Sequence, residues 1–60
     1  MIKDYDKKNN ILYIKWDKDE YGVSEEITTR KGNYIVIDYS KNGKIIGIEI
    51  FDYEKNKKPQ

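Results

Sequence analysis

Short runs of β-branched and aromatic residues alternate along the chain with polar stretches that contain Gly, Asn or Asp. Val, Ile, Tyr, Phe and Trp suit the pleated, half-buried surface of a sheet, whereas Gly, Asn and Asp favour turns. No stretch keeps the 3.6-residue spacing of apolar positions long enough for a stable helix. The pattern predicts five strands, at residues 2–6, 11–16, 23–29, 34–39 and 45–51.

The last two predicted strands flank a turn that contains Asn42 and Gly43. Asn-Gly is the preferred pair for a two-residue type I′ turn, since both positions need a positive φ. Such a turn pairs Lys41 with Lys44 and sets the register of the whole hairpin. The pairs expected on one side of this hairpin are Tyr39 with Ile46, Ile37 with Ile48, and Ile35 with Ile50.

Side chains alternate across each strand, which divides the residues of the expected sheet between two faces. One face, here called the apolar face, consists of Tyr5, Leu12, Ile14, Trp16, Ile35, Ile37, Tyr39, Ile46, Ile48 and Ile50. The other, here called the mixed face, combines aromatic, aliphatic and charged side chains. Its candidate partner-binding residues are Tyr13, Lys15, Tyr34, Val36, Asp38, Glu49 and Phe51.

These features predict one small all-β domain over residues 1–53, followed by a flexible polar tail over residues 54–60. We expect five antiparallel strands in a meander-like sheet that follows the chain order. No helix is expected to cover the apolar face, and fully burying one aliphatic side chain is worth roughly 1.5–3 kcal/mol. Two copies can therefore stack face to face as a homodimeric sandwich, which we favour. The alternative is a small curled half-barrel monomer, helped by a bend at Gly47.

Composition narrows the function classes. The 60-residue chain has no Cys and no His, which excludes a disulfide, a Cys/His zinc site, a Cys nucleophile and a His base. Lys and Arg number 12 against 11 Asp and Glu, so the net charge of +1 offers little attraction for nucleic acid. No stretch approaches the roughly 20 apolar residues of a membrane helix. We therefore expect a cytoplasmic protein that is not an enzyme and takes no cofactor or metal.

Asp38 and Glu49 are the one pair of residues that suggests chemistry. The expected register makes them diagonal neighbours on the mixed face, where two carboxylates could exchange a proton or bind a hard cation. A pocket is difficult to build on a small open sheet. Structural roles are favoured instead: Asp38 can accept hydrogen bonds near the turn, and Glu49 can pair with Lys15.

Two functions follow from these features. The first is a protein-interaction module that acts as a homodimer and binds or inhibits another protein, in the manner of an antitoxin or a phage-encoded inhibitor. The alternative is binding of single-stranded nucleic acid, whose bases could stack on Tyr13, Tyr34 and Phe51. Asp38 and Glu49 would repel phosphate at the centre of that surface. A protein partner is therefore favoured.

Residues 38–50 read DYSKNGKIIGIEI: an Asp at a strand end, a polar turn with Gly, two aliphatic residues and then Gly-Ile-Glu-Ile. With Tyr5-Asp6 and Leu12-Tyr13-Ile14 near the start, this pattern resembles the small proteins of domain of unknown function family 2283. The resemblance spans residues 5–51, and residues 17–33 contribute least to it. It implies a small β-rich protein of bacteria, archaea or phages, and it implies no activity.

Overall fold

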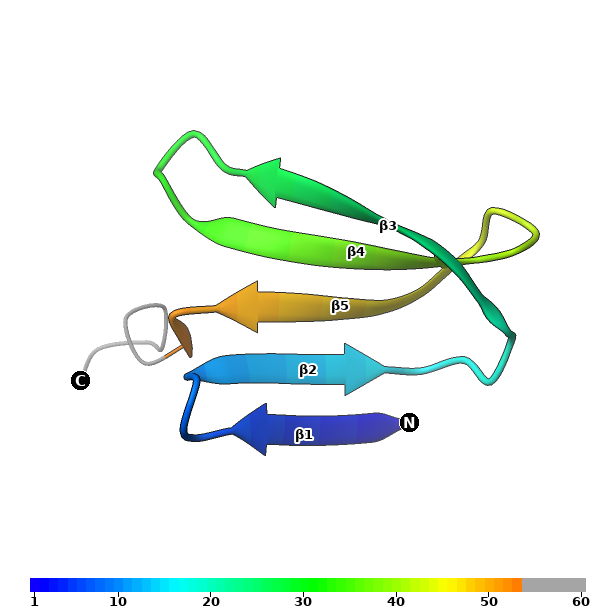
Figure 1. Cartoon of the computed structure of the whole chain (residues 1–60), viewed down its shortest axis with the longest axis horizontal. Helices are drawn as coiled ribbons and strands as arrows, with labels where there is room; N and C mark the ends of the chain where they lie inside the picture. The colour runs from blue at the N-terminus through cyan, green and yellow to red at the C-terminus, as the bar shows by residue number, and fades with distance from the viewer. Residues whose placement is uncertain (54–60) are drawn as a thin grey trace.

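The computed structural model describes residues 1–53, which form one five-stranded antiparallel sheet (Figure 1). Its strands are β1 (Ile2–Asp6), β2 (Ile11–Lys15), β3 (Tyr21–Thr28), β4 (Tyr34–Ser40) and β5 (Ile45–Phe51). The predicted all-β class and the five antiparallel strands are confirmed, and each strand starts and ends within two residues of its predicted bounds. The tail predicted for residues 54–60 lies outside the described residues.

The order of the strands across the sheet is β1-β2-β5-β4-β3, so the expected chain order is not kept. β2 pairs with β5, and β3 becomes an edge strand on the far side of β4. Strands β2 to β5 therefore have the arrangement of a Greek key, in which a connection passes from β2 across the ends of β5 and β4. Because β1 and β3 are both edges, the sheet is open (Figure 1).

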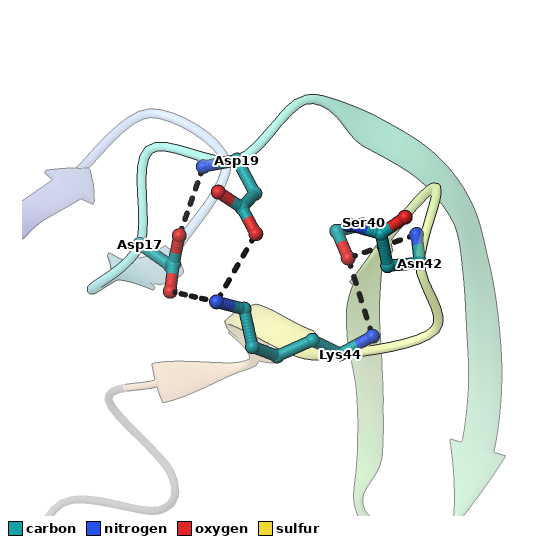
Figure 2. A network of polar contacts seen from close by, with 5 residues as sticks. All are labelled: Asp17, Asp19, Ser40, Asn42 and Lys44. Atoms are coloured by element: carbon teal, nitrogen blue, oxygen red, sulfur yellow. Dashed lines mark hydrogen bonds and ion pairs between the residues drawn. The ribbon is translucent and has the colours of Figure 1, made fainter.

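Ion pairs join the crossing segment between β2 and β3 to the β4–β5 turn (Figure 2). Lys44 Nζ lies 2.9 Å from Asp17 Oδ2 and 3.1 Å from Asp19 Oδ2. On the same turn, Ser40 Oγ accepts hydrogen bonds from the backbone N–H groups of Asn42 and Lys44, both at 3.2 Å. Hydrogen bonds to Asp17 and Asp19 raise the pKa of Lys44. The pKa of Asp17 is lowered, first by the backbone N–H of Asp19 and then by Lys44.

The turn between β4 and β5 differs from the predicted type I′ turn. Gly43 has a φ of 85°, but Asn42 is not among the residues with positive φ. The Ser40 N–H donates to the Lys44 carbonyl at 2.8 Å, and the Gly43 N–H donates to the Ser40 carbonyl at 2.9 Å. The loop therefore has three residues and ends on a left-handed glycine, which is the second common hairpin geometry.

A register shift next to this turn restores the predicted pairing. Tyr39 pairs with Ile45 instead of the predicted Ile46, which makes Ile46 an extra residue in β5. Beyond this bulge the predicted pairs of Ile37 with Ile48 and of Ile35 with Ile50 are confirmed. Gly47 follows the bulge, and a Cβ there would lie 2.9 Å from the Ile14 carbonyl oxygen of β2. The close approach of β2 and β5 therefore needs a glycine at this position.

Among residues 1–53 the buried apolar side chains are few: Leu12, Val36 and Ile46. Ile46, the extra residue of the bulge, is 1% exposed and lies on β5, the central strand of the sheet. Leu12 belongs to the apolar face and Val36 to the mixed face. Each face of the single sheet thus buries part of its apolar surface by lateral packing between neighbouring strands.

Candidate functional site

The strand registers bring the predicted apolar-face residues together on one side of the sheet. Directly paired residues of antiparallel strands share a face. One row across all five strands is Tyr5, Leu12, Ile50, Ile35 and Ile27, and the next row is Lys3, Ile14, Ile48, Ile37 and Glu25. A third row, beside the β4–β5 turn, contains Val23, Tyr39 and Ile45. Next to it, the Trp16 N–H donates a hydrogen bond to the Ile46 carbonyl at 3.0 Å.

Strand β3 extends this face by two apolar residues that the sequence reasoning did not assign to it, Val23 and Ile27. They pair with Tyr39 and Ile35 of β4. Their alternation with polar residues along β3 was visible in the sequence. The missing information was the pairing partner of β3, since a strand's face is defined only relative to its neighbours.

Among residues 1–53, no strand packs across the apolar face (Figure 1). The aliphatic side chains at its centre are half-buried: Ile14, Ile35, Ile37, Ile48 and Ile50. Trp16 is 47% exposed and Val23 is 60% exposed. At the β1 edge, the ring of Tyr53 packs edge-to-face on Tyr5, with centroids 5.4 Å apart. A contiguous apolar surface of this kind is typical of an interaction site.

Aromatic side chains contact one another on the mixed face as well. The rings of Tyr34 and Phe51 meet edge-to-face with centroids 4.8 Å apart. Val36 and Asp38 are 8% and 5% exposed, so neither side chain is open to a partner, although both belonged to the predicted partner-binding set. The half-buried remainder of that set is Tyr13, Lys15, Tyr34, Glu49 and Phe51.

Asp38 and Glu49 are diagonal neighbours on the mixed face, as the register predicted. Ser24 Oγ of β3 donates a hydrogen bond to Asp38 Oδ1 at 2.7 Å, and Ser24 Oγ lies 2.8 Å from the hydroxyl of Tyr21. Burial raises the pKa of Glu49, and the charge of Asp38 and a hydrogen bond with it raise that pKa further. The pKa of Tyr13 is also raised, first by burial and then by the two carboxylates. Glu49 therefore keeps its proton to a higher pH than an ordinary glutamate.

The partners of this carboxyl pair differ from those expected. The ion pairs of residues 1–53 involve Lys41 and Lys44, so Lys15 does not pair with Glu49. Asp38 is bound by a serine from the edge strand, which sequence reasoning missed because β3 was not known to adjoin β4 in this register. A groove of about 240 Å³ lies elsewhere, and its lining residues are Met1, Ile2, Lys15, Trp16, Asp17 and Lys18.

Two further findings concern the described part of the chain. It contains no group of three or more His, Cys, Asp or Glu side chains placed to hold a metal ion. Within the same residues, no helix has the length and apolar character needed to cross a membrane.

Comparison with known proteins agrees with the resemblance seen in the sequence. No curated protein and no solved structure matches the chain. A family model described as "Protein of unknown function (DUF2283)" matches residues 4–53, a range that takes in all of strands β2 to β5 and most of β1. That range also includes residues 17–33, which contributed least to the resemblance. The chain belongs to the DUF2283 family.

Proposed function

We propose that this protein is a non-enzymatic interaction module that forms a homodimer through its apolar face and binds another protein through its mixed face. The observation that carries the proposal is the apolar face itself. It is a continuous aliphatic surface that no strand of residues 1–53 covers.

The energetic argument rests on the half-buried isoleucines at the centre of that face. Complete burial of such a side chain is worth roughly 1.5–3 kcal/mol relative to full exposure, so each half-buried isoleucine has part of that still to gain. A small domain has little stability in reserve, because it buries only about 60% of the surface of its unfolded chain. A second sheet stacked about 10 Å away would remove this surface from water.

The mixed face supports a protein partner. It presents Tyr13, Tyr34 and Phe51 beside the charged groups of Lys15 and Glu49. Aromatic residues are enriched where proteins meet. A partner bound here could be inhibited by the module, which is how a small antitoxin or a phage-encoded inhibitor acts.

Single-stranded nucleic acid fits this face less well. A hydrogen bond with Glu26 is the main cause that raises the pKa of Tyr34, and burial followed by the charges of Asp38 and Glu49 raises the pKa of Tyr13. The aromatic rings that would stack on bases thus lie beside carboxylates, which repel the phosphate backbone. The buried Asp38, hydrogen-bonded to Ser24, supports a structural role for the carboxyl pair.

Two variants separate the roles of the faces. Ile48→Asp places a charge at the centre of the apolar face and should yield a monomeric or unfolded chain in light scattering and circular dichroism. Tyr34→Ala, on the mixed face, should leave the dimer intact and weaken binding of the partner protein. A folded Ile48→Asp variant with unchanged mass would contradict the assignment of the dimer interface.

A further inference from the structure

The apolar face carries charge at only two of its paired positions, and these lie at opposite edges of the sheet. Lys3 is on the edge strand β1 and Glu25 is on the edge strand β3. The registers place both in one row, in the order Lys3, Ile14, Ile48, Ile37 and Glu25. The row is therefore positive at one end, apolar in the middle and negative at the other end.

Neither charge is neutralised by an ion pair within residues 1–53. The ion pairs there involve the side chains of Lys41 and Lys44. Glu25 accepts a hydrogen bond from the Tyr39 hydroxyl at 2.8 Å, which holds the carboxylate beside the face without cancelling its charge. Lys3 and Glu25 cannot reach one another, since four strand spacings of about 4.8 Å separate their strands.

This polarity distinguishes the two symmetric ways of stacking the face on a second copy. A two-fold axis across the strands would place β1 over β1 and β3 over β3, so that like charges meet. A two-fold axis along the strands would place β1 over β3 at both edges, so that opposite charges meet. The aligned packing of twisted sheets is compatible with either axis, so the charges of Lys3 and Glu25 determine which axis is favoured.

We infer that the homodimer has its two-fold axis along the strands, with Lys3 facing Glu25 of the partner subunit at both edges. Ile48, in the middle of the row, then lies near the axis against its own copy, and Ile14 faces Ile37 of the partner subunit. The inference rests on the proposed homodimer and adds its geometry. The edge charges act mainly as a selector of orientation, because exposed ion pairs contribute little affinity.

Cysteine cross-linking tests this geometry directly, since the chain has no Cys of its own. Lys3→Cys and Glu25→Cys are purified separately and treated with a short bismaleimide whose reach matches the roughly 10 Å between stacked sheets. The inferred axis predicts little cross-linked dimer from either variant alone and several-fold more from their equimolar mixture. Asp4→Cys, mixed with Glu25→Cys, is the matched control, because Asp4 lies on the same edge strand but on the mixed face.

The outcomes distinguish the inferred two-fold axis from the proposed homodimer on which it rests. If the wild-type protein is a dimer, two results would overturn the inferred axis: each variant cross-links with itself, or no combination of variants cross-links. The homodimer would stand in both cases. A monomeric wild-type protein in light scattering would overturn both. As a second measurement, Lys3→Glu should weaken dimerisation on the order of tenfold, because two attractive pairs become repulsive. Adding Glu25→Lys should restore it.

Discussion

The bulge beside the β4–β5 turn places two adjacent isoleucines in opposite environments, which allows a matched pair of substitutions. Ile46 is 1% exposed and Ile45 is 43% exposed. Truncating a buried isoleucine to valine removes one methyl group and typically lowers the free energy of unfolding by about 0.5–1.5 kcal/mol. The same truncation at an exposed site stays within about 0.5 kcal/mol.

These magnitudes are large for this protein. A chain of 60 residues is expected to unfold with roughly 3–9 kcal/mol. Ile46→Val should therefore lower the urea midpoint measurably, whereas Ile45→Val should leave it almost unchanged. Ile46→Ala, at about 2–5 kcal/mol, should abolish most of the stability. Because Ile46 is buried within one chain, the ranking should hold whether or not the chain dimerises.

The assay is urea denaturation followed by circular dichroism, with all variants at one protein concentration so that any association contributes equally. The slope of the transition should not change between the valine variants. Equal losses for Ile45→Val and Ile46→Val, or a larger loss for Ile45→Val, would show that the bulge does not place Ile46 in the core. That result would refute the register described for this end of β5.

Three further predictions concern contacts made by β3 and β5. Gly47→Ala should lower the free energy of unfolding by about 1–3 kcal/mol in urea denaturation, because the new Cβ would lie 2.9 Å from the Ile14 carbonyl oxygen. Wild-type stability would rule out that close approach. Ser24→Ala should cost about 1–3 kcal/mol, since it removes the hydroxyl that donates to the buried Asp38 carboxylate; a neutral effect would mean that another donor replaces it. The pKa of Glu49 is raised in the folded protein above its ordinary value of 4.5. Protonated Glu49 therefore stabilises the fold at a pH below 4.5, and this stabilisation is lost as the pH rises through the raised pKa. Glu49→Gln should therefore gain stability relative to wild type between pH 4 and pH 7, and a pH-independent difference in urea midpoints would contradict the shift.

The strands could be predicted from the sequence because each is specified locally. The β-branched and aromatic runs end at Gly, Asn and Asp, and the hairpin of β4 and β5 is contiguous in the chain. Its central pairs, Ile37 with Ile48 and Ile35 with Ile50, were predicted from a two-residue turn, and they are confirmed because the bulge at Ile46 offsets the longer loop. The alternation of side chains also assigned the aliphatic residues of the apolar face to one side of the sheet, without knowledge of the strand order.

The strand order could not be predicted because it depends on contacts distant in sequence. β2 has the same periodicity whether it adjoins β3 or β5. The ion pairs of Asp17 and Asp19 with Lys44 hold the connection across the β4–β5 turn, and nothing local marks those residues as partners. The turn was misjudged for a related reason. Asn-Gly suits a type I′ turn, but Ser40 Oγ also binds two backbone N–H groups and supports the longer loop with its bulge.

The central claim is that the apolar face is the surface on which two copies meet. The most direct test is the solution mass of the wild-type protein by light scattering, across a dilution series and at low and high salt. We predict twice the mass of the chain at the higher concentrations, and a dimer that persists at high salt because its interface is mainly apolar. The mass of a single chain at every concentration would show that the apolar face does not join two copies.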